Sequence, residues 1–329
     1  WPPAEATSVE AALFLGKALD LQGQTDAAHT AYADGLTVAA GLLSKMVHLH
    51  TQRSLSYLHE RDLTLAWQEA NRARYLAENM VGTLHEQSGQ LEAAHTHYMM
   101  ALELAQTIND QAGMARNYHN LGNLACRRLQ IEEAIHCYTL AMASHQQIGD
   151  RVGMEYARSG LVTTYMQALR YAEVMAPAQQ ALTFFQRLGD SFWTALNASN
   201  LAEAYTELGN LGEAERYAAL VLEQEEPHSH PYALFTLGRV REQQQRLSEA
   251  ELYLSQARKV AELNQDHYLL AYVWEALGKI YRSSDKVDAA RAAFTQAQQA
   301  FQTLHITQKA EALTLLIAEL DASPSDRDA

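Results

Sequence analysis

The stretch from Trp274 to Leu304, WEALGKIYRSSDKVDAARAAFTQAQQAFQTL, predicts two short helices joined by a polar turn. The first helix carries its large and small apolar residues on one face: Trp274, Leu277, Gly278 and Tyr281. The second helix carries Ala290, Phe294 and Ala297 at positions i, i+4 and i+7. This spacing places their side chains on one stripe of the helix. We expect Gly278 and Ala290 to let the two backbones approach, with Tyr281 and Phe294 filling the space beside them. One such hairpin cannot bury its own apolar stripe, so copies of it must stack.

Copies of this unit recur through the chain. Most copies pair a leucine, often followed by glycine, with an alanine twelve residues after the glycine position, although the second copy is degenerate and has Arg53 in place of the leucine. Seven of the eight copies have this alanine: Ala28, Ala66, Ala94, Ala134, Ala214, Ala250 and Ala290. In the fifth copy Val174 replaces it. The hairpins are predicted to start near residues 9, 47, 75, 115, 155, 195, 231 and 271, so that one continuous array covers 9–306.

The junctions between hairpins follow the same period. Asn109-Asp110, Gly149-Asp150 and Gly189-Asp190 place a helix stop before an aspartate that caps the next helix. Pro231 suits the first turn of a helix, whereas Pro177 falls inside a predicted helix and is expected to disturb the packing there. Residues 307–320 are predicted to form a capping helix and 321–329 a disordered tail. Residues 1–8 are expected to be a leader or a cut linker, and the start at Trp1 suggests a trimmed, longer polypeptide.

The order Trp, Leu-Gly, Tyr, Ala, Phe, Ala resembles the tetratricopeptide repeat, a helical hairpin of about 34 residues, and the resemblance covers nearly the whole chain. It implies an all-α, right-handed superhelical solenoid that binds partners on a concave face lined by the first helices. The 40-residue spacing of the central copies, with its Gly-Asp junctions, resembles three kinds of array. They are those of kinesin light chains, of bacterial peptide-responsive regulators, and of the C-terminal sensors of STAND and LuxR-like regulators.

Composition narrows the classes of function. The chain has 25 basic and 39 acidic residues, a net charge of −14, which disfavours generic binding to nucleic acid. No run of about 18 apolar residues and no signal peptide is visible, so we expect no membrane contact and a cytoplasmic protein. Cys126 and Cys137 are too few for a disulfide framework and are expected to be buried free thiols.

Neither a metal site nor catalysis is indicated. Histidines one residue apart, as at His95 and His97, point in different directions on a helix, and no third ligand follows at a fixed offset. The chain has no phosphate-binding glycine loop, no Gly-x-Ser-x-Gly and no His-Glu-x-x-His motif. We therefore expect no cofactor and no enzymatic activity.

The resemblance places candidate binding residues at the polar positions of the first helices. Arginine can hold a carboxylate, and asparagine can pair with a peptide backbone. Tyrosine and phenylalanine would supply anchoring area. The alternative is that these positions are simply the solvated face of each helix. The candidates are Arg116, His119, Asn120, Asn123, Arg127, Tyr156, Asn200, Glu203, Tyr232, Phe235, Arg239, Tyr272, Lys279 and Arg282.

These observations predict a non-catalytic module that binds a protein or peptide segment. We expect it to be the sensor or partner-docking part of a larger bacterial regulator, attached to effector or ATP-binding domains before Trp1. Two alternatives stay open. One is a receptor for a small effector, held near the fifth hairpin where Pro177 lies, and the other is a structural scaffold for oligomerisation.

Overall fold

The computed structural model describes residues 47–48, 50–58, 61–224, 226, 228–304 and 306–321. The hairpin expected near residue 9, the leader at 1–8 and residues 322–329 of the expected tail lie outside this part of the chain. Within it all regular secondary structure is helical, which confirms the all-α fold. After helical residues at 50–58, the helices are α3 (Leu63–Gln87), α4 (Leu91–Thr107), α5 (Gln111–Arg127), α6 (Ile131–Ile148), α7 (Arg151–Gln167), α8 (Tyr171–Leu188), α9 (Ser191–Glu207), α10 (Leu211–Leu222), α11 (His230–Gln243), α12 (Leu247–Leu263), α13 (His267–Ser283), α14 (Val287–Thr303) and α15 (Thr307–Asp321).

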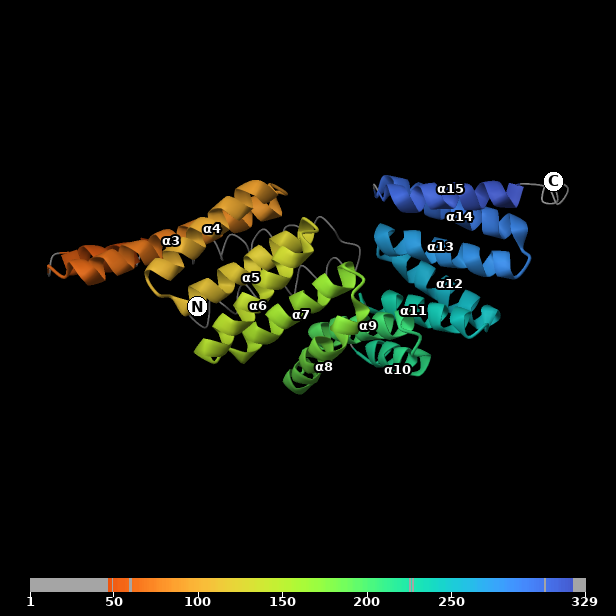
Figure 1. Ribbon diagram of the computed structural model, residues 1–329, viewed down its shortest axis with the longest axis horizontal. Helices are drawn as coiled ribbons and strands as arrows, with labels where there is room; N and C mark the ends of the chain where they lie inside the picture. The colour runs from red at the N-terminus through yellow and green to blue at the C-terminus, as the bar shows by residue number, and fades with distance from the viewer. Residues whose placement is uncertain are drawn as a thin grey trace. The chain divides into compact units, whose positions relative to one another are not determined.

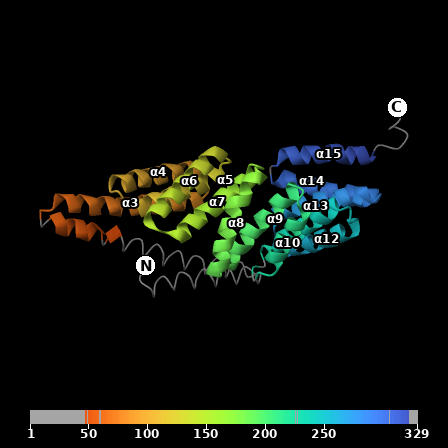
Figure 2. The same ribbon diagram turned by 60° about the horizontal axis from the view of Figure 1, so that its bottom comes forward.

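The helices pack as consecutive hairpins in two compact units, residues 1–164 and 165–329, with α7 crossing the division. In the first unit α3 packs on α4 and α5 on α6, and α4 contacts α5. In the second unit the hairpins are α9–α10, α11–α12 and α13–α14, with α8 on α9 and α15 on α14. Figures 1 and 2 show the hairpins of this unit following one another in chain order, from green α9 to blue α15. The expected stack of sequential hairpins is therefore confirmed.

Close contact inside several hairpins depends on glycine. A Cβ built at Gly278 would lie 2.4 Å from the Phe294 ring, and one built at Gly122 would lie 2.9 Å from Tyr138. Phe294 is fully buried, as is the alanine Ala290 that precedes it by one turn. Because any side chain at these glycines would collide with the ring sixteen residues later, the small and large residues of the repeat act as a matched pair.

The repeat alanines and the junction residues behave as the sequence predicts. All the described alanines twelve residues after the glycine position are buried, and Val174 is fully buried in their place. Gly149 and Gly189 end their helices with φ of 73° and 76°, a left-handed conformation that glycine adopts without strain. The aspartates after the junctions accept hydrogen bonds from the backbone N–H three residues on: Asp110 from Gly113 at 3.0 Å, Asp150 from Gly153 at 2.9 Å and Asp190 from Trp193 at 3.1 Å.

Two segments are more continuous than the repeat pattern suggests. The hairpin start expected near residue 75 falls inside α3, one helix of 25 residues with no proline and no glycine before Gly82. Without a residue that ends a helix, the second helix of one hairpin continues into the first helix of the next. Pro177 lies in the second turn of α8 and does not interrupt it, and Val174 and Ala178 on either side are fully buried.

Candidate functional site

The first helices of three hairpins in the second unit, α9, α11 and α13, lie side by side. Helix α11 contacts both α9 and α13, so equivalent positions on the three helices lie side by side. Buried Leu201, Leu237 and Leu277 mark the inner side of each helix. We define the α9–α11–α13 face by four positions around each of these leucines. Two lie before the leucine, by two and five residues, and two lie after it, by two and six residues. The members of this face used below are Ser199, Glu203, Glu207, Tyr232, Phe235, Arg239, Gln243, Tyr272, Glu275 and Lys279.

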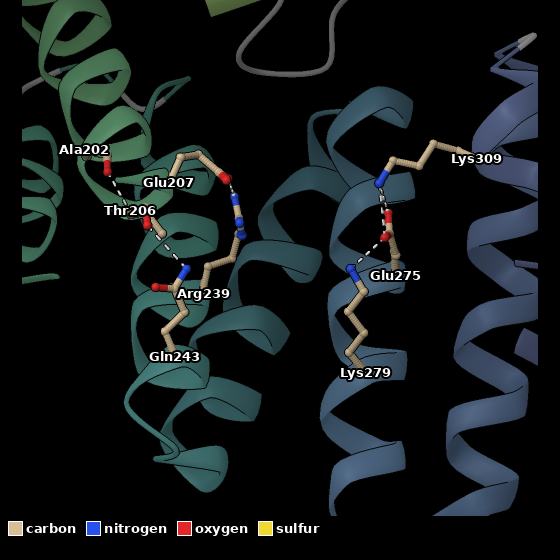
Figure 3. Close-up of polar contacts among 8 residues, drawn as sticks. All are labelled: Ala202, Thr206, Glu207, Arg239, Gln243, Glu275, Lys279 and Lys309. Carbon is tan, nitrogen blue, oxygen red and sulfur yellow. Dashed lines mark hydrogen bonds and ion pairs between the residues drawn. The ribbon is translucent and has the colours of Figure 1, made fainter. Parts of the chain in front are cut away.

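Polar contacts join α9 to α11 across this face (Figure 3). The Arg239 guanidinium lies 2.6 Å from the Glu207 carboxylate. One turn further along α11, the Gln243 side-chain amide donates to the Thr206 carbonyl over 3.3 Å. The Arg239 guanidinium also lies 5.8 Å from the centre of the Phe235 ring, within range of a cation–π contact. These contacts hold the side chains of Arg239 and Gln243 in place on the surface.

Glu275 is held between two lysines from different helices. Its carboxylate accepts from Lys279 Nζ at 2.7 Å, one turn along α13, and from Lys309 Nζ of α15 at 2.9 Å (Figure 3). The residue is only 8% exposed. Burial raises its pKa, but the hydrogen bonds and charges of the two lysines outweigh burial and leave the pKa below its usual value. Glu275 is therefore an ionised, fully paired carboxylate that ties α15 to α13.

Glu203 has a different environment. Its side chain is exposed to solvent, yet it accepts no hydrogen bond and has no cation within 4.0 Å among the described residues. Desolvation by the surrounding protein raises its pKa, and the charge of Arg239 offsets part of this rise. Glu203 thus offers an accessible negative charge that the fold does not pair.

Tyrosines of α11 and α13 supply aromatic surface in the same unit. Tyr232 donates its hydroxyl to Asp266 over 2.6 Å and is 38% exposed. The Tyr268 hydroxyl donates to that of Tyr272 over 3.3 Å, with 5.0 Å between the ring centres, and Tyr268 is 52% exposed. The Tyr272 ring packs edge-on against Phe301, and Lys309 Nζ lies 5.4 Å from its centre. Rigid aromatic surface is therefore accessible next to charged groups.

The candidates in the first unit have partners within the chain. Arg116 donates to the hydroxyl of buried Tyr75 over 2.9 Å, and Arg127 donates to the Glu86 carbonyl and carboxylate over 3.2 and 3.3 Å. The Tyr138 hydroxyl donates to Asn123 over 2.6 Å. These contacts join α5 to α3 and to α6. The guanidinium groups of Arg116 and Arg127 therefore already donate hydrogen bonds to oxygen atoms of the protein.

The remaining candidates are placed as follows. Desolvation lowers the pKa of His119 to about 4, and its ring packs edge-on against Tyr138 at 5.7 Å. Asn120 and Tyr156 are partly buried on α5 and α7. The side-chain nitrogen of Asn200 is buried without a hydrogen-bond partner. Arg282 lies over the Phe294 ring, 6.0 Å from its centre, near the turn of its hairpin.

Sequence reasoning did not single out Lys309, Tyr268 or Tyr171. Tyr268 stands four residues before Tyr272 on the same helix, so helical spacing could have found it. Lys309 lies on the helix beyond the last complete hairpin, and Tyr171 lies on a second helix. A rule restricted to the first helices of the repeats could not reach either residue.

Other kinds of site are not seen in the described residues. Over the ranges given above, no group of three or more His, Cys, Asp and Glu side chains is arranged to hold a metal ion. No described helix combines the length and apolar character needed to cross a bilayer. Cys126 and Cys137 are both buried as free thiols, as the sequence predicts, and burial raises the pKa of each, that of Cys137 to about 11.

Comparison with known proteins supports the repeat assignment. Residues 271–302 match the tetratricopeptide repeat family. A search of curated proteins found no match. Among solved structures, the apo form of RapI aligns with a TM-score of 0.62 and 16% identity over 75% of this chain and 97% of its own. A Rap protein complexed with competence and sporulation factor aligns with a TM-score of 0.53 and 14% identity over 97% and 98% of the two chains.

A STAND protein with a tetratricopeptide repeat sensor from Pyrococcus horikoshii also aligns, with a TM-score of 0.57 and 13% identity. The alignment covers 97% of this chain and 53% of the STAND protein, so this chain spans about half of that protein's length. At such identities the structural likeness shows a shared fold. Residues 271–302 thus match a tetratricopeptide repeat, and the hairpins that precede them share the helical fold of these structures.

Proposed function

We propose that the chain is a non-catalytic module that binds a protein or peptide segment on its α9–α11–α13 face. We further propose that it acts as the sensor or partner-docking part of a larger bacterial signalling or transcription regulator. The observation that carries this proposal is the placement of Tyr232, Tyr272 and Glu203 on neighbouring first helices. It combines accessible aromatic surface with an unpaired charge.

This combination suits a peptide. Tyrosine rings bury a large area at a small cost in side-chain entropy, and they anchor many peptide interfaces. Charged and amide groups beside them fix the direction and register of the bound chain. Because the side chains project from packed helices and not from loops, they are held in position before a ligand arrives, which lowers the entropic cost of binding.

The structural relatives support the same class of function. A Rap protein of this fold has been solved in complex with competence and sporulation factor, and the STAND protein has a tetratricopeptide repeat sensor. Tetratricopeptide repeat proteins are in general non-catalytic binding modules, and this chain is proposed to act in the same way. The residues of the first unit, Arg116 to Arg127, would contribute less to binding because their guanidiniums are engaged with Tyr75 and Glu86.

A selection from a random peptide library displayed on phage tests this proposal with the whole chain as bait. We expect enrichment of peptides that share a motif and compete with one another for the protein. A parallel selection against a denatured sample removes peptides that bind exposed apolar surface. Failure to enrich any competing peptides would contradict peptide binding and would favour a small effector or a scaffold role instead.

A further inference from the structure

The carboxylates of the α9–α11–α13 face differ in whether a cationic side chain pairs with them. Glu207 is paired with Arg239, and Glu275 with Lys279 and Lys309. Glu203 has no such partner, although Arg239 is near enough to act on it through its charge. An accessible carboxylate without a counter-ion, on a chain with a net charge of −14, attracts a cation from outside.

The charge of Glu203 acts on tyrosines of several helices. Burial raises the pKa of the Tyr171, Tyr232 and Tyr272 hydroxyls, and in each the Glu203 carboxylate adds to the rise. Glu203 is therefore electrostatically close to tyrosines of α8, α11 and α13. A carboxylate with tyrosines on the neighbouring helices offers a cationic side chain two kinds of attraction: charge-assisted hydrogen bonds to the carboxylate and cation–π contact with a ring.

A second observation on α9 points to a ligand at the same place. The Ser199 hydroxyl, one turn before Glu203 on the same side of the helix, is buried and has no hydrogen-bond partner. The side-chain nitrogen of Asn200 next to it is in the same state. A buried polar atom without a partner is unfavourable, and a peptide group that reached this part of α9 would supply the missing hydrogen bond.

We propose that Glu203 binds an arginine or lysine side chain of a peptide from another molecule, beside the rings of Tyr232 and Tyr272. The guanidinium or ammonium group donates to the Glu203 carboxylate, and the peptide backbone approaches Ser199 and Asn200. This inference rests on the proposed peptide-binding function and adds the chemical class of the residue that the site selects.

Two pools of octapeptides test the inference, one with a central arginine and one with a central citrulline, both flanked by random residues. Citrulline has nearly the shape of arginine but no charge. We expect the parent chain to bind the arginine pool at least about tenfold more tightly. In Glu203→Gln the ratio should fall close to one. In the matched control Glu213→Gln, on the second helix α10, the ratio should stay as in the parent.

The outcomes separate this inference from the proposed function. Two results would contradict the cation site but leave peptide binding intact. In one, both pools bind and Glu203→Gln keeps the parent's preference for arginine. In the other, both pools bind and the parent shows no preference. If neither pool binds, both proposals are wrong. Glu203 is exposed, so Glu203→Gln should fold normally, and Glu203→Asp should retain part of the preference because it keeps the charge.

Discussion

The Arg239 guanidinium lies 2.6 Å from the Glu207 carboxylate and joins α11 to α9. This ion pair leaves Glu203, one turn earlier on α9, as an accessible carboxylate without a counter-ion. The arrangement of the pair thus decides which charge on the α9–α11–α13 face is free for a ligand.

Replacing Arg239 should strengthen the binding of cationic peptides. In Arg239→Gln the surface loses a positive charge, and Glu207 joins Glu203 as an unpaired carboxylate. We expect affinity for an arginine peptide to rise severalfold, about 1 kcal/mol at most for a partly exposed pair. Fluorescence anisotropy with a labelled peptide measures this. Arg216→Gln, which removes an exposed ion pair with Glu213 on α10, is the control and should change nothing. A loss of affinity in Arg239→Gln would show that the arginine itself contacts the ligand.

Gly278→Ala should destabilise the chain. Its new Cβ would lie 2.4 Å from the buried Phe294 ring, and the repacking this forces costs about 1–3 kcal/mol. Gly212→Ala is the matched control, because nothing lies within 4 Å of a Cβ there, and alanine favours the α10 helix by up to about 1 kcal/mol. Thermal unfolding followed by circular dichroism should give opposite signs for the two variants. Equal effects would show that the contact with Phe294 is not specific.

Leu129→Gly should stabilise the chain. Leu129 has a left-handed φ of 57° in the turn between α5 and α6, and its side chain is 70% exposed. Glycine removes a backbone strain of about 1–2 kcal/mol but raises the entropy of the unfolded chain, so we expect a net gain of about 0.5–1 kcal/mol. The same change at exposed Leu84, inside α3, should cost about 1 kcal/mol. Chemical denaturation compares the two, and a loss at position 129 would mean that its side chain matters more than its backbone.

His119 should make stability depend on pH. Desolvation lowers its pKa to about 4 in the folded state, against about 6.5 when unfolded. The unfolded chain therefore binds the proton more tightly, and stability falls as the pH drops from about 6.5 to about 4. The loss should reach about 2–3 kcal/mol. In His119→Gln the free energy of unfolding should vary less over this window, as measured by urea titration at several pH values. Parallel profiles for the two proteins would contradict a neutral, desolvated imidazole.

Much of the fold follows from short-range patterns in the sequence. The paired glycine and aromatic residues, the alanine twelve positions on and the aspartate caps each act within one hairpin, and each has its expected role. The joining of two repeats into α3 was harder to foresee, because it depends on the absence of a stop signal near Tyr75 and not on a residue that is present. Pro177 could not be judged from the sequence either, because only the structure shows that the helix continues around it.

The proposed binding surface was less predictable than the fold. Repeat positions place Glu203, Tyr232 and Arg239 on neighbouring first helices, but they say nothing about which charges pair. Arg116 and Arg127 look free in the sequence, yet the structure gives them partners on α3, about 40 residues away in the chain. Such pairings depend on side-chain rotamers across helices, which no periodicity specifies.

The central claim is that a peptide binds at the α9–α11–α13 face. Isothermal titration calorimetry of a selected peptide against the parent, Tyr232→Ala/Tyr272→Ala and the control Tyr253→Ala on α12 tests it most directly. We predict that the double variant loses at least about tenfold in affinity, since two aromatic anchors are removed, while the control binds as the parent does. Circular dichroism confirms that all three are equally helical. Unchanged affinity in the double variant would contradict the account, because the peptide would then bind elsewhere on the chain.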